Sequence, residues 1–181
     1  MAEPIELVFP RQEHRQLVEG YLAECSAKGE TAIQGGAGME RLPYDQWLQK
    51  LQNSLREETV APGLVPSTTF LALKKETGEM VGVIDIRHRL NEHLLVFGGN
   101  IGYSVRPSLR RQGYCTEMLR LALFQCRKMG MERALVTCDK VNIASAGVIR
   151  KNGGLLENEI PDENGELVCR FWIDLNGKSP Q

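Results

Sequence analysis

Two arginines, a glutamine and a glycine stand directly before a predicted helix, in the segment Arg110–Cys115 (RRQGYC). The first backbone N–H groups of a helix have no acceptor within the helix, and together with the helix dipole they attract an anion. Gly113 lets a ligand approach the backbone closely, and Arg110 and Arg111 add positive charge beside the turn. We therefore predict that this turn binds phosphate, in the form of a diphosphate or a phosphate ester.

Two common phosphate-binding motifs do not account for this turn. It contains Gly113 alone and not the pattern GxGxxG, which makes an NAD-dependent enzyme a poor alternative. The pattern GxxxxGK followed by Ser or Thr is also missing from the sequence, which excludes a P-loop.

The periodicity of the apolar residues places the turn between a strand and a helix. Apolar residues recur at the helical spacing at positions 115, 118, 119, 122, 126 and 129. This pattern predicts a helix from Tyr114 to about Met129, with Cys115 as the first residue of its buried face. A strand at about 100–105 precedes it and an apolar strand at 133–139 follows it. The three elements form a crossover, so we expect the two strands to lie parallel.

The remaining elements predict an α/β protein with a mixed, mostly antiparallel sheet flanked by helices. A short strand at 5–9 precedes two helices, at 11–28 and 44–58, and strands at 68–74 and 80–88 form a hairpin. A short helix at 142–151 precedes a final pair of strands at 155–160 and 166–175. The order is β-αα-βββ-α-β-α-ββ, and we expect a single domain over residues 1–181.

The composition excludes several classes of function. A net charge of −1 gives no basic field that would attract nucleic acid. No apolar run approaches the roughly 18 residues that a membrane span needs, and the first residues lack a signal-peptide pattern. The five cysteines are scattered, odd in number and without a CxxC pair, which favours buried thiols over disulfides or a metal site. We expect a soluble cytoplasmic protein without a metal.

Two segments of the sequence resemble the GNAT family of N-acyltransferases, which use acetyl-CoA. Val105–Cys115 (VRPSLRRQGYC) is similar to the family signature, in which V-x-P is followed by Gln or Arg and then by glycine. It departs only at the last position, where the family has Gly or Ala and this chain has Cys115. Asn142–Ser145 and Val148–Gly154 resemble the family's second helix and its glycine end. The resemblance in element order extends over about residues 5–175.

The resemblance implies a binding mode for acetyl-CoA. Backbone N–H groups of Arg110–Cys115 would hold the pyrophosphate, and Thr116 would add a hydroxyl. The strand that ends at Val105 would pair with the pantetheine arm, and Asn142 and Ser145 would face that arm from the other side. In the family this strand diverges from its parallel neighbour, and the arm lies in the gap. The implied acetyl-CoA residues are Tyr103, Ser104, Val105, Arg110, Arg111, Gln112, Gly113, Tyr114, Cys115, Thr116, Asn142 and Ser145.

The expected reaction is direct attack of a neutral amine on the thioester, which needs a base, an oxyanion donor and an acid for the thiolate. Many relatives have an acidic residue near the start of the strand and a tyrosine in the last helix. This chain has Asn100 and Ile149 at those places. Weak substitute candidates are His88 and Asp85, together with Asn100 itself, although a histidine at a strand end is more often structural. The general base and general acid therefore stay unassigned.

The sequence favours an N-acetyltransferase that acts on a primary amine of a small molecule, a peptide or a protein. The missing tyrosine keeps a second hypothesis open, a catalytically silent acyl-CoA-binding or sensing protein. A thiol nucleophile is less favoured, because no histidine lies at a recognisable spacing from a cysteine. We expect the acceptor to meet the loops at 29–43 and 60–68 and the turn at 162–165. The long apolar last strand favours pairing with a second copy of the chain as a homodimer.

Overall fold

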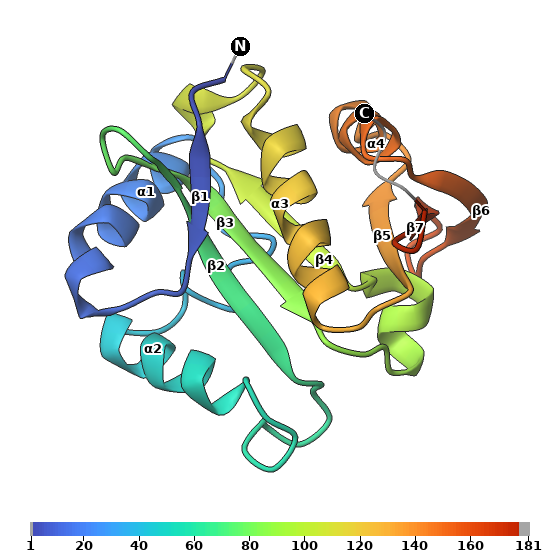
Figure 1. Cartoon of the computed structure of the whole chain (residues 1–181), viewed down its shortest axis with the longest axis horizontal. Coiled ribbons are helices and arrows are strands. Elements are labelled where there is room, and N and C mark those ends of the chain that lie inside the picture. Colours follow the sequence, from blue (N-terminus) through green and yellow to red (C-terminus); the bar gives the residue numbers. More distant parts are fainter. Residues whose placement is uncertain (1, 178–181) are drawn as a thin grey trace.

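The computed structural model describes residues 2–177, and its elements follow the predicted order (Figure 1). The strands and α-helices are β1 (Ile5–Val8), α1 (Arg15–Ala27), α2 (Tyr44–Asn53), β2 (Ser67–Lys74), β3 (Met80–Arg87), β4 (Ile101–Val105), α3 (Tyr114–Lys128), β5 (Arg133–Asp139), α4 (Ile143–Lys151), β6 (Leu155–Pro161) and β7 (Leu167–Asp174). Short helical segments also occur at Gln12–His14, Leu94–Gly98 and Pro107–Leu109. The fold class is the predicted one, with antiparallel sheets flanked by helices.

The strands form two sheets, whereas the sequence predicted one mixed sheet. The first has the order β1-β2-β3-β4 and the second the order β5-β7-β6, and every ladder is antiparallel. The sheets meet where β4 and β5 begin: the Asn100 N–H donates to the Leu135 carbonyl at 2.7 Å, and the Leu135 N–H donates to Asn100 Oδ1 at 2.9 Å. No ladder joins these two strands in the part of the chain that is described, so a gap separates them beyond this junction.

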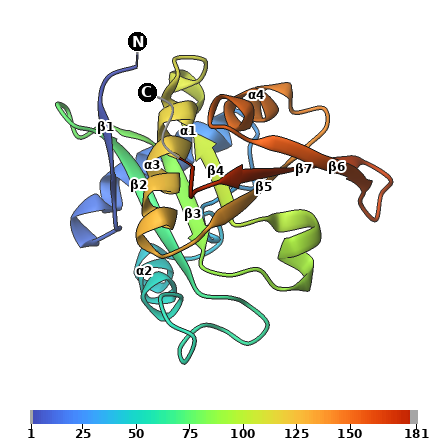
Figure 2. The same ribbon diagram turned by 45° about the vertical axis from the view of Figure 1, so that its right-hand side comes forward.

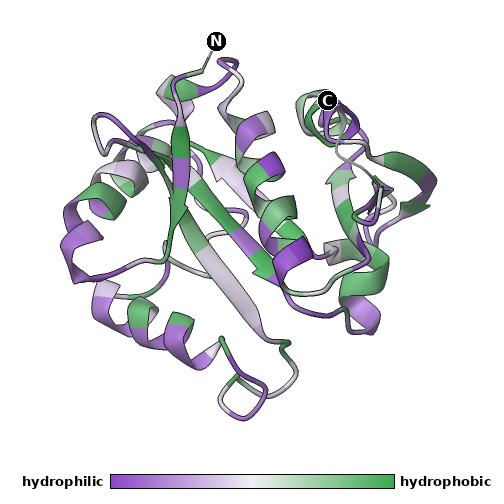
Figure 3. Cartoon of the chain, in the orientation of Figure 1, coloured by the Kyte–Doolittle hydropathy of each residue, from purple (hydrophilic) through white to green (hydrophobic). Residues whose placement is uncertain are grey.

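Two apolar cores cover the two faces of the first sheet. One core combines α1 and α2 with residues of β2 and β3 such as Leu71 and Val83. The other is formed by α3, the second sheet and the opposite face, which includes Ile84 and Val105. Figure 1 shows α3 packed over one face of the first sheet. Bands of hydrophobic and hydrophilic residues alternate along α1, α2 and α3 in Figure 3, as expected for helices with one buried face.

Two predictions need correction, one about the end of the second helix and one about the position of the last strand. The helix expected to reach Glu58 ends at Asn53, where the backbone N–H and the hydroxyl of Ser54 both donate to the carbonyl of Lys50 at 2.9 Å. The last strand is not free to pair with another chain, because β7 lies between β5 and β6 (Figure 2). The turn after Pro161 folds β6 back along β7, so the sequence argument for a homodimer no longer holds.

Candidate active site

The turn before α3 has the backbone shape of an anion site. Arg111 and Gly113 both have left-handed conformations, with φ of 61° and 92°. Left-handed residues in such a turn direct neighbouring N–H groups to one side and form a concave site for anions. The left-handed region costs a residue with a Cβ, such as Arg111, about 1–2 kcal/mol, and strain of this kind is concentrated at functional sites. The turn therefore has a backbone conformation in which N–H groups can bind an anion.

Gly113 leaves the space in front of the turn open. A Cβ at this position would meet only the Cβ of Ala2, at 3.8 Å, which is ordinary van der Waals contact. The side chain of the next residue, Tyr114, is buried in the core, with the Lys74 ammonium over its ring, so Tyr114 offers the turn only its backbone.

The Arg110 side chain binds residues outside the turn. Its guanidinium donates to both oxygens of Glu30, at 2.6 and 2.7 Å, and to the Val105 carbonyl at 3.0 Å. The hydrogen bond from Arg110 lowers the pKa of the Glu30 carboxyl, which therefore stays ionised. Arg110 links the loop after α1 to the end of β4, and its charge is neutralised there. Arg111, which is exposed, is the arginine that remains beside the turn.

Cys115 is partly buried against the main core. Burial raises the pKa of its thiol to about 12, which is the opposite of what a nucleophilic cysteine needs. The structure gives Cys115 a packing role and leaves its backbone for the turn.

One edge of β4 is unpaired and faces the gap. Hydrogen-bonded positions alternate along an antiparallel pair. The Arg87 N–H donates to the Asn100 carbonyl and the Arg106 N–H to the Val81 carbonyl, each at 2.7 Å, which fixes the alternation between β3 and β4. The N–H and carbonyl groups of Ile101, Tyr103 and Val105 therefore point away from β3. Except at the Val105 carbonyl, which accepts from Arg110, a bound chain with an extended conformation can pair with this edge.

Side chains from β4 and α4 meet across the gap. The hydroxyls of Tyr103 and Ser145 are hydrogen-bonded at 2.8 Å, and burial raises the pKa of Tyr103, which keeps it protonated. Ser145 is held in turn by Asn142, whose Oδ1 accepts its backbone N–H at 3.0 Å as the N-cap of α4. Asn142 is exposed, and its role in this structure is that of a helix cap. The structure thus brings together Tyr103 and Ser145 of the predicted set.

The candidate catalytic residues have structural partners. Asp85 is buried; it accepts from the Thr69 hydroxyl at 2.8 Å and forms an ion pair with Arg87 at 3.5 Å. Asn100 is also buried, and its amide joins β5 to the Arg87 carbonyl. His88 shares a hydrogen bond with the Thr68 hydroxyl at 2.8 Å. Among the hydrogen bonds of the described residues, none joins these three side chains to Tyr103 or Ser145, so none of the three is placed there as a base.

The protonation of His88 should make stability depend on pH. Burial lowers the pKa of His88 below its ordinary value of 6.5, and the Asp85 charge opposes this shift only in part. The neutral form is therefore the one favoured by folding, so its contribution is present above pH 6.5 and is lost as the pH falls. We expect His88→Gln to reduce the fall in melting temperature between pH 7.5 and 5 relative to the unmutated chain. An identical pH profile for the two proteins would contradict this assignment.

The element order, the separation of β4 from β5 and the turn before α3 agree with the arrangement that the resemblance to the GNAT family implied. The model of the acetyltransferase (GNAT) domain family matches residues 21–154. Because this match spans most of the chain, the protein belongs to the GNAT family. No curated protein matches the sequence significantly.

Several solved structures share the fold. A ribosomal-protein-S5-alanine acetyltransferase from Vibrio fischeri has a TM-score of 0.71 and 14% identity, over 99% of this chain and 98% of the other. A ribosomal L7/L12 alpha-N-protein acetyltransferase, solved in complex with coenzyme A, has a TM-score of 0.69 and 18% identity, over 97% of both chains. A ribosomal-protein-serine acetyltransferase from Vibrio cholerae, described as putative, has a TM-score of 0.67 and 15% identity, over 96% and 95%. At these identities the likeness shows the fold alone.

Sequence reasoning did not find the loop residues that contact β4. The Gly102 carbonyl lies 2.2 Å from where a Cβ of Gly35 would be, and Glu30 binds Arg110. The only signal was the glycine-rich composition of 29–43, which predicted a functional loop but no partner for it. A loop residue and its contact on a distant strand share no local pattern.

Within 2–177, no helix is long and apolar enough to cross a membrane. The same part of the chain holds no group of three His, Cys, Asp or Glu side chains able to bind a metal ion.

Proposed function

We propose that the protein is an acetyl-CoA-dependent N-acetyltransferase that transfers an acetyl group to a primary amine by direct attack. One observation supports this most strongly. The open turn at Arg111–Gly113 leads directly back along the unpaired edge of β4, so a phosphate site and a strand edge for an extended arm are continuous. CoA has this combination of a pyrophosphate and a long amide-containing arm.

Different residues of the chain would bind acetyl-CoA and promote the transfer of the acetyl group. Acetyl-CoA supplies the acetyl group as a thioester. Backbone N–H groups of 111–115 would hold the pyrophosphate, and the free edge of β4 would keep the arm extended. The Tyr103 N–H points into the gap and would stabilise negative charge that develops on the thioester oxygen. A C–N bond forms while the C–S bond breaks, and water accepts the amine proton because Asp85 is committed to Arg87 and Thr69.

We propose the Tyr103 hydroxyl, held by Ser145, as the donor of a proton to the leaving sulfur. Burial raises the pKa of Tyr103, which keeps its proton in place before the reaction but makes it a weaker acid, and Ser145 lies at 2.8 Å. Tyr103→Phe should lower kcat by roughly tenfold, less than the roughly 100-fold that a general acid commonly contributes, because a thiolate is a good leaving group. The KM for acetyl-CoA should change little. Ser145→Ala should give a smaller loss in kcat, and a Tyr103→Phe enzyme with unchanged kcat would exclude this acid.

The decisive experiment is a thiol-release assay. The protein is incubated with acetyl-CoA and, in turn, with peptides bearing different N-terminal residues, polyamines and amino acids. Amine-dependent release of the CoA thiol supports the proposed reaction, and mass spectrometry of the product identifies the acceptor. Peptides and spermidine come first in the panel because proteins of this fold carry names that refer to ribosomal proteins and to spermidine.

A silent acyl-CoA-binding protein is the alternative, and one observation favours it. Ile149, which stands where relatives have a tyrosine, is fully buried in the main core and offers no polar group. Stabilisation of the fold by acetyl-CoA without release of thiol in the presence of any amine would support this alternative. Absence of stabilisation by CoA would exclude both functions.

We further propose that the protein works as one domain in the cytoplasm. The main core draws residues from both sheets, which supports a single folding unit. All five cysteines are free, although Cys138 and Cys169 lie directly opposite each other on β5 and β7. Such a pair persists as thiols in a reducing compartment.

A further inference from the structure

Three side-chain donors hold three backbone carbonyls of one short segment, Gln34–Ala37. The Ser104 hydroxyl donates to the Gln34 carbonyl at 2.7 Å. From α2, Trp47 Nε1 donates to the Gly36 carbonyl at 2.9 Å, and Lys50 Nζ donates to the Ala37 carbonyl at 2.6 Å. The segment is therefore fixed from two sides, by β4 and by α2.

The residue between these anchors lies directly on β4. An ideal Cβ on Gly35 would be 2.2 Å from the Gly102 carbonyl oxygen and 2.8 Å from the Tyr103 nitrogen. Gly35 has a φ of 73°, and Ala37 is held at 53°, a left-handed conformation that a residue with a Cβ rarely adopts. The three hydrogen bonds thus hold the backbone of the segment against the peptide group between Gly102 and Tyr103.

This peptide group needs external support. β4 pairs with β3 on one edge and faces the gap on the other, so its hydrogen-bond ladder restrains one edge only. The Gly102–Tyr103 peptide carries the N–H that points into the gap. Small displacements of groups that act on a reacting carbonyl have large effects on rate, about 100-fold for 1 Å.

We infer that Gln34–Ala37 is a backbone clamp that positions the Tyr103 N–H for acyl transfer, and that Lys50 and Trp47 are positioning residues acting through it. The inference rests on the proposed function, since it assigns a role within that reaction. It extends the catalytic machinery to α2, which contributes no residue to the gap.

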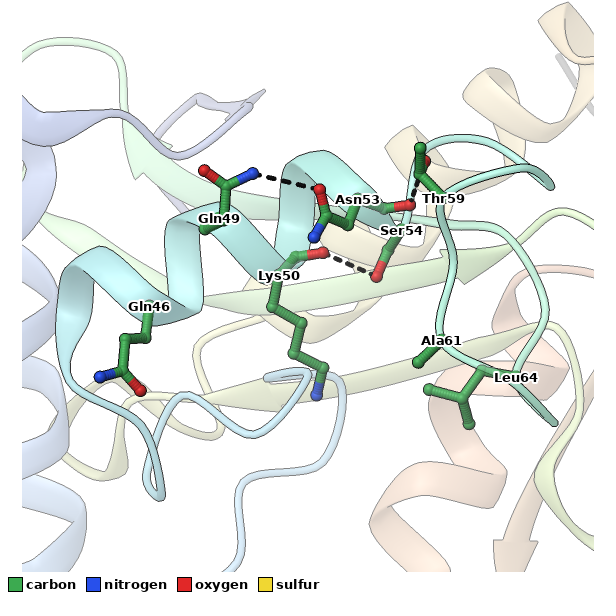
Figure 4. A pocket seen from close by; sticks show the side chains of 8 residues that line it. All are labelled: Gln46, Gln49, Lys50, Asn53, Ser54, Thr59, Ala61 and Leu64. Atoms are coloured by element: carbon green, nitrogen blue, oxygen red, sulfur yellow. Dashed lines mark hydrogen bonds between the residues drawn. The ribbon is translucent and has the colours of Figure 1, made fainter.

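Lys50 is the most direct point at which to test the clamp. It lines an open cavity of about 410 Å³ beside α2, together with neutral side chains that include Gln49 and Asn53. In Figure 4 the Lys50 side chain extends away from Gln49 and toward the neighbouring loop. Lys50 is only partly buried, so its replacement leaves the apolar core intact. Gln49, one position earlier on the same helix, donates to Asn53 at 3.1 Å and makes no hydrogen bond to the clamp in the described structure.

The test compares Lys50→Met, which keeps the length of the side chain and removes the donor, with Lys50→Arg, which restores a donor. Lys50→Met should lower kcat roughly tenfold with the KM for acetyl-CoA within about twofold of the unmutated protein. Lys50→Arg should recover most of kcat, and the control Gln49→Met should match the unmutated protein. Trp47→Phe, which keeps an aromatic ring and removes the N–H, should lower kcat in the same direction. Equal kcat in Lys50→Met and Gln49→Met would overturn the inference.

A second readout separates this inference from the proposed reaction. Amide hydrogen exchange at Tyr103 is measured with acetyl-CoA bound, and Lys50→Met should exchange several times faster than Gln49→Met. This measurement needs no acceptor. If the protein binds acetyl-CoA but acetylates no amine, the proposed reaction is wrong, and exchange still tests the clamp. Equal exchange at Tyr103 in the two variants would show that Lys50 does not hold this peptide.

Discussion

Gly113→Val should abolish detectable CoA binding while the protein stays folded. The left-handed φ of 92° gives a valine backbone strain, and its side chain would occupy the open space in front of the turn. Two lost hydrogen bonds to a charged group, at about 1.5–3 kcal/mol each, correspond to a loss in affinity of about 100-fold or more. Isothermal titration with CoA measures this directly, and thermal denaturation shows whether the variant is folded.

Gly78→Val is the matched control for backbone strain. Gly78 has a φ of 71° in the turn between β2 and β3, and a Cβ there would meet nothing within 4 Å. This variant should lose a similar amount of stability and bind CoA normally. If both valine variants lost CoA affinity equally, the effect would come from general destabilisation and not from the turn.

Arg111→Ala tests how much of the affinity for CoA comes from the Arg111 side chain and how much from the backbone of the turn. Exposed charges contribute little, about 0–1 kcal/mol, so the affinity for CoA should fall only a few-fold and should become less sensitive to salt. Arg110 is neutralised by Glu30, so its charge contributes less still. A larger loss from Arg111→Ala than from Gly113→Val would contradict a site made of backbone N–H groups.

The sequence predicted well those features that depend on local patterns. The helical spacing of apolar residues after Tyr114 placed α3 within one residue of its observed end, because burial of one face imposes that spacing. The left-handed Gly113 at the helix start and Gly130 just after the helix end follow from the conformations that only glycine adopts easily. The element order was readable for the same reason.

Features that depend on residues far apart in the sequence were not predictable. Arg110 was expected to add charge to the turn, but it pairs with Glu30, which is 80 residues away. The last strand was expected to pair with a second copy of the chain, but it lies in the centre of its sheet, because β6 pairs on its outer side. Asn100 was considered as a replacement for a catalytic acid, and the structure uses it to connect β4 with β5. Pattern and composition fix the elements, whereas these partners are chosen by the packing of the whole chain.

Gly35→Ala should have the second large effect, on both stability and transfer. The new Cβ would lie 2.2 Å from the Gly102 carbonyl oxygen, so either the loop or β4 must move. Overpacking typically costs about 1–3 kcal/mol, and a left-handed alanine adds about 1 kcal/mol or more. If the Tyr103 N–H is displaced by about 1 Å, the rate of acetyl transfer should fall by about 100-fold. Urea denaturation and steady-state kinetics measure the two effects separately.

Gly29→Ala separates strain from collision within the same loop. Gly29 has a φ of 78°, close to that of Gly35, but a Cβ there would have nothing within 4 Å. This variant should lose only the roughly 1–2 kcal/mol of left-handed strain and should keep its kcat. The difference between the two alanine variants therefore reports the contact between Gly35 and β4. Equal rates of acetyl transfer in the two variants would mean that β4 does not depend on the loop. A Gly35→Ala enzyme that loses kcat but retains its affinity for CoA would show that the loop positions the reacting end of β4 independently of the phosphate turn.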